Sequence, residues 1–222
     1  MSFSTNFARA LAPLAIVAVA TPAAAADSAD MARLKAHISA VQTMTADFVQ
    51  TDSRGRSAAG TMQLKRPGEV RFEYGSGDLL LVANGKTLTI IYYQVGQKSS
   101  YPLNRTPLGV LLSSSPNLKG RAKILPSKDS HVVSVLARDP TQYGSLTLVF
   151  LRSGSAPGGL SLYGWTAIDA QNHRTTVKLS NVRYNVPISE SAFTYREPKK
   201  KGALQKFHFR TCSSLRQAVG PR

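Results

Sequence analysis

Residues 61–74 read TMQLKRPGEVRFEY, and they hold two runs of alternating apolar and polar side chains on either side of a Pro-Gly pair. Alternation with a period of two is typical of a β-strand that buries one face, and Pro-Gly is a strong turn signal. The segment therefore predicts two adjacent antiparallel strands with a shared apolar face. Arg66 follows Met62 and Leu64 at the same spacing of two, so it is the charged member of an apolar row.

The same alternation recurs at Leu88, Ile90 and Tyr92, and other apolar runs add further strand candidates. Further strand candidates are residues 79–83, 88–92, 132–137, 146–151, 160–165, 175–179 and 193–196. Turn signals rich in Gly, Pro, Asn and Asp separate them. The pattern predicts a meander of about ten short antiparallel strands.

Two segments have a helical pattern instead. In residues 27–43 the apolar side chains recur at spacings of three and four, which is typical of a helix that packs one stripe onto a neighbour. Residues 106–112 combine a Thr cap, Pro at the first helical position and an apolar run. Two helical pieces and one large sheet predict an α+β fold that is mainly antiparallel β, with the sheet curled around the helices.

The first 26 residues predict a secretory signal peptide. Arg9 precedes an apolar run at residues 10–20, and small residues follow to Ala26, where we expect cleavage. The apolar run is about half the ~20 residues that a membrane span needs. We therefore expect a soluble exported domain at residues 27–198 and a basic tail at residues 199–222.

The charge balance is strongly basic, with 28 Lys and Arg against 12 Asp and Glu, or +16. Such a charge favours nucleic acid, an anionic membrane surface or an acidic partner. Seven of the positive residues and none of the acids lie in residues 199–222, which leaves the folded part only mildly basic. No recognition motif of aromatic and basic residues accompanies the tail, so we expect no nucleic-acid partner.

Catalytic and metal motifs are missing from the sequence. It holds one cysteine and four widely separated histidines, with no spacing typical of a metal site, no nucleophile elbow and no glycine-rich phosphate loop. We therefore expect no metal, no cofactor and no enzyme activity. An esterase, in which a histidine pairs with a distant Asp, is a remote alternative.

Several segments in fixed order resemble one known family. They are KRPGEVRFEY at 65–74, FVQ at 48–50, LVANGKTL at 81–88, TPL at 106–108, RTT at 174–176 and the closing Phe193-x-Tyr-x-x-Pro198. Together, from about residue 31 to residue 198, they resemble the periplasmic outer-membrane lipoprotein carrier family, LolA. Val70 departs from this family, which often has an aromatic residue there.

The resemblance implies an incomplete, half-open β-barrel whose apolar concave face is covered by helices. It implies a monomeric periplasmic chaperone that binds the acyl chains of lipoproteins. The cargo would come from an ATP-driven releasing complex in the inner membrane and go to a receptor in the outer membrane. The family needs no cofactor. It also implies a role for Arg66, whose counterpart bonds to the lid and holds the empty cavity shut.

The predicted acyl-chain cavity combines this resemblance with the strand parity. Its lining would consist of Met62, Leu64, Val70, Phe72, Tyr74, Leu81, Leu88, Ile90, Leu108, Leu111 and Leu112.

Four alternatives stay open. The same residues could form a filled core, and Arg66 could be an exposed arginine at a strand end. The chain could also be a lipid-binding or envelope-stress sensing module of the same fold. Finally, its charge leaves open a basic protein that binds a membrane surface or nucleic acid.

Overall fold

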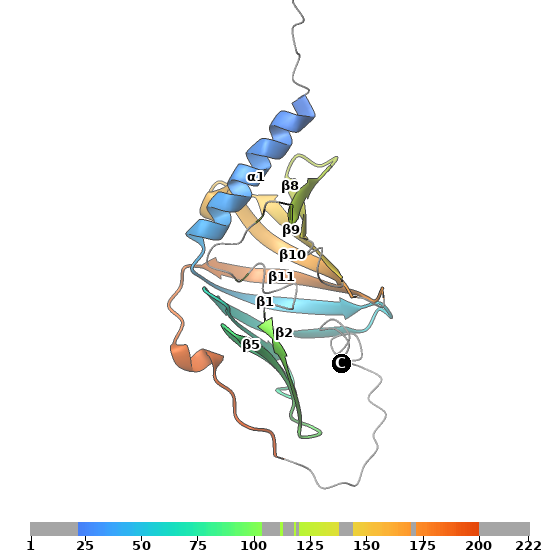
Figure 1. Ribbon diagram of the computed structural model, residues 1–222, viewed down its shortest axis with the longest axis vertical. Helices are drawn as coiled ribbons and strands as arrows, with labels where there is room; N and C mark the ends of the chain where they lie inside the picture. The colour runs from blue at the N-terminus through green and yellow to red at the C-terminus, as the bar shows by residue number, and fades with distance from the viewer. Residues whose placement is uncertain are drawn as a thin grey trace, which may run out of the picture.

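A computed structural model describes residues 22–103, 112, 118, 120–137, 144–169 and 172–199, with side chains from residue 26 onward (Figure 1). One long helix precedes a large antiparallel sheet. The elements are, in chain order, α1 (Pro22–Ala40), β1 (Thr43–Asp52), β2 (Ser57–Lys65), β3 (Glu69–Tyr74), β4 (Leu79–Asn84), β5 (Thr87–Tyr92), β6 (Gln97–Pro102), β7 (Ala122–Leu125), β8 (Val132–Ala137), β9 (Ser145–Arg152), η2 (Pro157–Gly159), β10 (Leu160–Ile168), β11 (Arg174–Tyr184) and η3 (Glu190–Phe193).

The sheet has eleven strands in the order β6-β5-β4-β3-β2-β1-β11-β10-β9-β8-β7. It consists of two meanders, β1 to β6 and β7 to β11, which are joined by antiparallel pairing of β1 with β11. The first and last strands in this order do not pair with each other, so the sheet stays open. The predicted fold, an incomplete antiparallel barrel of about ten strands, is confirmed with eleven.

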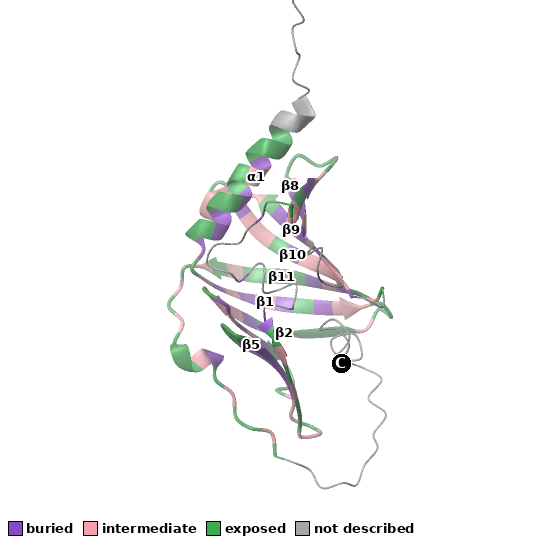
Figure 2. Ribbon diagram, viewed as in Figure 1, coloured by how far each residue is buried: buried purple, intermediate pink, exposed green. Residues whose placement is uncertain are grey.

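The inner face of the sheet, defined here as the face on which α1 packs, carries the main core. Its cross-strand partners form continuous apolar rows. One row runs through Ile90, Leu81, Phe72, Met62 and Ala46, and another through Ile124, Val135, Leu148, Trp165 and Val177. Figure 2 shows how the burial alternates along the strands. The period-two pattern of the sequence thus decides which side chains face inward.

Helix α1 forms from the predicted segment, although it ends at Ala40 rather than at residue 43. Its buried apolar side chains are Leu34 and Ile38, and they join the core cluster of β7 to β10. The chain then turns directly into β1, so that the apolar residue Val41 belongs to the sheet core rather than to the helix. The second predicted helix, residues 106–112, lies outside the described residues except for Leu112.

The glycine at position 158 allows η2 to approach α1 closely. A Cβ at Gly158 would lie 2.4 Å from the backbone nitrogen of His37 and 2.9 Å from the carbonyl oxygen of Arg33. The residue also has a φ of +65°, which glycine adopts most readily. This contact fixes the position of α1 over the sheet.

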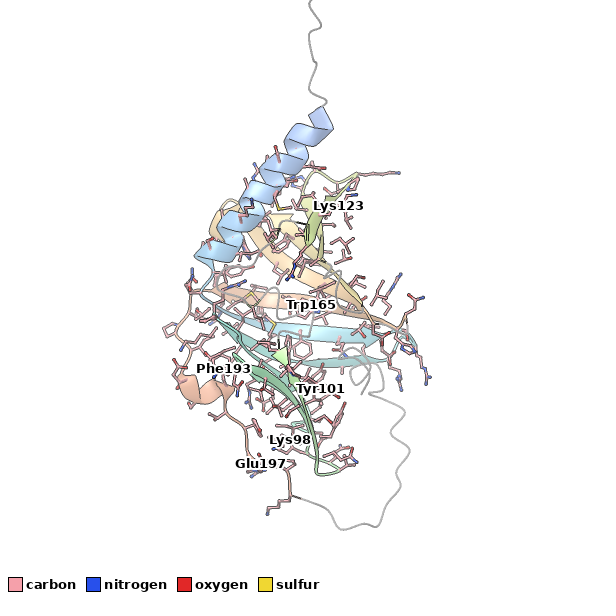
Figure 3. All side chains as sticks on the ribbon, viewed as in Figure 1. Lys98, Tyr101, Lys123, Trp165, Phe193 and Glu197 are labelled. Carbon is pink, nitrogen blue, oxygen red and sulfur yellow. The ribbon has the colours of Figure 1, made fainter. Side chains whose placement is uncertain are left out.

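The outer face is covered on one side by a C-terminal strap, residues 186–199. Within it, Phe193 is buried against Leu80, Val82 and Ile91. Ion pairs join Glu190 to Lys65 and Glu197 to Lys98, the latter with an Nζ to oxygen distance of 2.6 Å (Figure 3). This strap explains why strand β4 is apolar at five consecutive positions, since both of its faces are buried.

The prediction of a strand at residues 193–196 is wrong. The chain forms a short 3₁₀ helix at Glu190–Phe193 and continues without pairing to the sheet. Phe193 and Tyr195 alternate as they would in a strand, but they pack on the sheet from outside instead of joining it.

The two ends of the chain fall mainly outside the described residues. The structure does not describe residues 1–21 of the predicted signal peptide or residues 200–222 of the predicted tail. Residues 22–26, which the sequence assigns to the signal peptide, form the first residues of α1. In the part of the chain that is described, no helix combines the length and the apolar character needed to cross a membrane.

Candidate functional site

The candidate site is the apolar inner face. Most of the predicted cavity residues lie together there, in one buried cluster: Met62, Val70, Phe72, Tyr74, Leu81, Leu88, Ile90 and Leu112. Leu64 packs against this cluster and is partly exposed. Leu108 and Leu111 lie outside the described residues. The structure thus places the described members side by side, and their role as a lipid cavity remains a prediction.

The apolar lining extends well beyond the predicted residues. A second cluster covers the inner face of β7 to β10, with Phe150, Leu148 and Val135 among its buried members. Leu162 and Trp165 contact both clusters, and the Trp165 ring meets the Phe72 ring edge to face at 5.9 Å between centroids (Figure 3). The inner face is therefore one apolar surface that spans both meanders.

Sequence reasoning missed this second half of the lining. The strands were predicted from their alternation, but nothing in the sequence showed that the second meander packs beside the first. That arrangement depends on the pairing of β1 with β11, whose partners Phe48 and Leu179 are 131 positions apart.

Aromatic rings and one polar pair occupy the centre of the first cluster. Phe48 contacts the rings of Phe72 and Tyr74 edge to face, at 5.6 and 5.0 Å. The Tyr74 hydroxyl donates a hydrogen bond of 2.7 Å to the Gln50 side-chain oxygen, and both residues are buried. Because this donor and acceptor satisfy each other, they add little polarity to the apolar face.

Two separate parts of the chain cover the inner face. Helix α1 covers the β7 to β10 half. Over the other half, Leu103 and Leu112 are buried in the first cluster, and the backbone N–H of Gly68 donates to the Leu112 carbonyl at 2.8 Å. Leu118 is buried in the second cluster. The connection from β6 to β7 thus contacts both halves through its described leucines.

Arg66 lies at the border between these covers. Its side chain is half-buried, so the alternative of a fully exposed strand-end arginine does not hold. Its backbone N–H donates to the Gln42 carbonyl at 2.8 Å, and burial lowers the pKa of the guanidinium. The predicted lid-closing role remains a prediction, because the lid segment 104–111 is outside the described residues.

His37 is a buried residue of the site that the sequence analysis did not single out. Its Nδ1 lies 2.8 Å from the Pro157 carbonyl oxygen, and its ring meets Phe150 and Tyr184 edge to face at 5.3 and 5.4 Å. Burial lowers the pKa of His37, and the positive charge of Arg66 lowers it further. The neutral imidazole therefore links α1 to both halves of the inner face.

The first half of α1 is held by a second polar contact. The Asp30 carboxylate accepts hydrogen bonds from both terminal nitrogens of Arg152 at the end of β9, at 2.5 and 2.7 Å, and another from Arg33 at 3.2 Å. The Arg152 hydrogen bonds lower the pKa of Asp30 despite its burial. Sequence reasoning missed this pair as well, because its members are 122 residues apart.

The described residues contain no group of three or more His, Cys, Asp or Glu side chains placed to hold a metal ion. What the inner face offers instead is a large apolar surface, formed by the two buried clusters. Such a surface can shelter hydrocarbon from water.

Comparison with known proteins agrees with this geometry. Residues 39–196 match the family model described as outer membrane lipoprotein carrier protein LolA. The chain belongs to this family. The resemblance noted from the sequence is thereby confirmed, and LolA-family membership implies a lipoprotein as cargo.

Named relatives of the chain cover most of its length. An outer-membrane lipoprotein carrier protein of Chromobacterium violaceum is 29% identical over 189 residues, which cover 80% of this chain and 88% of the relative. One from Pseudomonas fluorescens is 28% identical over 207 residues, covering 87% and 96%. Among solved structures, a LolA superfamily protein from Nitrosomonas europaea matches with a TM-score of 0.40 and 11% identity, over 79% of this chain and 99% of that one.

Proposed function

We propose that this protein is a soluble periplasmic chaperone that binds the acyl chains of lipoproteins and delivers them to the outer membrane. The single observation that carries the proposal is the continuous apolar inner face that runs from β5 to β7 through Trp165. The family supports a lipoprotein cargo, and the inner face supplies a surface of matching chemistry. The proposed role is binding and release, without a covalent step.

The energetics of the cargo fit such a surface. Each methylene that leaves water contributes about 0.8 kcal/mol, so two or three long acyl chains need shelter while they cross an aqueous compartment. Full burial of all of them would exceed the practical affinity limit of about −18 to −21 kcal/mol. A carrier that also has to release its cargo should therefore bury the chains only in part, or should have an empty state that its own cover stabilises.

The cover of the inner face suits such an exchange. The leucines at positions 103, 112 and 118 fill apolar surface that acyl chains would otherwise contact. Cargo that displaces them replaces one set of apolar contacts with another, so the net free energy of binding stays moderate. Arg66, at the edge of this cover, is the proposed polar contact that favours the closed, empty state.

The pathway around the protein follows from the same proposal. We propose cleavage of a signal peptide near Ala26, export to the periplasm and action as a monomer. Cargo would arrive from an ATP-driven releasing complex in the inner membrane and leave to an outer-membrane lipoprotein receptor. Neither metal nor cofactor is required for these steps.

Site-specific photocrosslinking tests the proposal at two positions of one strand that flank Gly164 and face opposite sides of the sheet. A photoreactive phenylalanine analogue replaces Trp165, on the inner face, or Tyr163, which is exposed on the outer face of the same strand. Each exported protein is incubated with inner-membrane vesicles that carry the releasing complex and a lipoprotein with radiolabelled palmitoyl chains. The membranes are then removed, and the soluble fraction is irradiated.

We expect the label to attach to the protein with the analogue at position 165 and not to the one with the analogue at 163. Equal labelling at the two positions, or none at 165 while lipoprotein is still released, would contradict acyl-chain binding on the inner face. Recovery of free lipid without protein cargo would instead favour the lipid-sensing alternative.

A further inference from the structure

The outer face of β1, β9 and β10 exposes large apolar side chains. Among the described residues, the exposed large hydrophobics are Val49 at 46%, Tyr163 at 42% and Leu151 at 37%. They come from these three strands, and all of them point away from the inner clusters. We call the surface formed by Val49, Leu151, Tyr163 and the intervening Lys178 the outer stripe.

The strand pairing brings these residues into one neighbourhood. Lys178 of β11 is the cross-strand partner of Val49 on one side and of Gly164 on the other, next to Tyr163. Leu151 of β9 pairs with Ser161, two residues before Tyr163. The outer stripe therefore crosses four adjacent strands.

A β-bulge presents Tyr163 on this surface. Leu162 pairs with Phe150 and Gly164 pairs with Val149, which leaves Tyr163 as the extra residue of β10. Gly164 makes the bulge possible, because a Cβ there would lie 2.2 Å from the Val177 carbonyl oxygen. Bulges of this kind commonly redirect a side chain, and here the redirected ring is exposed to solvent.

The charges around the outer stripe are mainly positive. On the outer face of β1, β9, β10 and β11, the basic side chains are Arg174, Lys178 and Arg183, and all three are exposed. The acidic side chain on this face is Asp47, which accepts a hydrogen bond of 2.6 Å from the Asn181 amide. An aromatic ring beside aliphatic groups and exposed cations is the combination that favours an anionic lipid–water interface.

On the other half of the outer face, over β4 and β5, the chain covers the apolar side chains itself. There the strap places Phe193 over Leu80, Val82 and Ile91. The outer stripe has no such cover from the described residues. A second copy of the chain is a poor partner for it, because a symmetric pairing would bring two sets of three positive charges together.

We propose that the outer stripe docks the protein transiently on the surface of an anionic phospholipid bilayer. Tyr163, Val49 and Leu151 enter the headgroup region, and Lys178 with its two neighbouring arginines attracts the anionic headgroups. This contact uses the face opposite to the acyl-chain surface. Docking would therefore leave the covers of the inner face free to move, and it does not depend on cargo binding.

Cosedimentation with vesicles tests this docking. The cargo-free full exported chain is mixed with vesicles of phosphatidylcholine alone or of phosphatidylcholine and phosphatidylglycerol at a ratio of three to one, at low and at physiological salt. The variants are Lys178→Gln, Tyr163→Ser and Tyr163→Trp. Lys35→Gln serves as the charge-matched control, since Lys35 is exposed on α1, which packs on the inner face of the sheet, opposite to the outer stripe.

We expect the wild-type protein to bind the anionic vesicles and to lose binding as salt rises. Removal of one positive charge near the surface, in Lys178→Gln, should weaken binding about fivefold. Tyr163→Ser should weaken it several-fold as well, whereas Tyr163→Trp should bind at least as well as wild type because tryptophan also favours the interface.

The docking proposal fails if Lys178→Gln and Lys35→Gln weaken vesicle binding by the same factor, because the effect then depends only on the net charge of the protein. It also fails if Tyr163→Ser binds like wild type. A concentration-dependent dimer that Tyr163→Ser abolishes, without any change in vesicle binding, would overturn it in favour of a second copy. Photocrosslinking of acyl chains at position 165 is independent of all these outcomes, so failure of one proposal leaves the other intact.

Discussion

The carboxylate of Asp30, in α1, receives two parallel hydrogen bonds from the guanidinium of Arg152, at the end of β9. Such a bidentate pair of hydrogen bonds between a guanidinium and a carboxylate is among the strongest side-chain interactions in proteins. It ties the first half of the helix to the end of β9 in the second meander. The helix is therefore a fixed part of the cover over the inner face.

Asp30→Asn should destabilise the protein by about 1–3 kcal/mol, because the partly buried guanidinium of Arg152 loses its charged acceptor. Urea unfolding followed by tryptophan fluorescence measures this change. Arg33→Gln is the matched control. Arg33 is half exposed, and its contact with the same carboxylate is longer, at 3.2 Å. Its effect should stay below about 1 kcal/mol. Equal losses for the two variants would show that the Arg152 contact does not anchor the helix.

His37 should make the stability pH dependent. Its pKa is lowered in the folded chain, mainly by burial, so the unfolded chain binds the proton more readily. Stability is then fully present above the unfolded pKa of about 6.5 and decreases as the pH falls toward the lowered pKa of the folded chain. The comparison is between the unfolding free energies of wild type and His37→Phe from pH 7.5 to 5. The variant should have the flatter profile, and parallel profiles would rule out this role.

A backbone contact makes Gly60 hard to replace. A Cβ there would lie 2.1 Å from the Glu73 carbonyl oxygen and 2.8 Å from the Phe48 ring, so β2 and β3 would have to separate. Gly60→Ala should cost about 3 kcal/mol or more. Gly154→Ala is the control, because nothing lies within 4 Å of its added Cβ, and its effect should be within about 0.5 kcal/mol. Thermal unfolding separates the two cases.

Arg66→Leu tests the proposed lid contact without disturbing the backbone. The hydrogen bond from the Arg66 N–H to Gln42 persists in the variant, so only the guanidinium is lost. Without it the closed state is less favourable, and cargo should be accepted but retained. Transfer of radiolabelled lipoprotein from the soluble complex to vesicles bearing the outer-membrane receptor is the measurement. Normal transfer by the variant would remove Arg66 from the mechanism.

The sequence was sufficient to predict which side chains face inward in the first meander. Met62 and Phe72 alternate with polar residues, and cross-strand pairing then makes them neighbours. Local periodicity decides the face of a strand, and an apolar face must be buried somewhere. For this reason the predicted lining and the open antiparallel sheet could be obtained from local patterns and from the resemblance.

Long-range pairing and polar edge strands could not be obtained in this way. Strand β6 (Gln97–Pro102) is mostly polar because it lies at the edge of the sheet, so it lacks the alternation that identifies a strand. The Asp30 contact with Arg152 and the bulge at Tyr163 depend on which strands meet. Phe193 shows the opposite error, since an alternating segment can pack on a sheet without joining it.

The strap across β3 to β6 should contribute strongly to stability, whereas the chain beyond it should not. Phe193→Ala removes a buried ring and should cost about 3–5 kcal/mol. A chain that ends after Lys201 keeps the strap, including the contact of Glu197 with Lys98, so its melting temperature and its cargo uptake should match those of the full chain. Glu197→Gln serves as the control for an exposed contact and should change little. A large drop in melting temperature for the shortened chain would mean that residues 202–222 are part of the folded domain, and an unchanged melting temperature for Phe193→Ala would mean that the outer face of β4 does not need its cover.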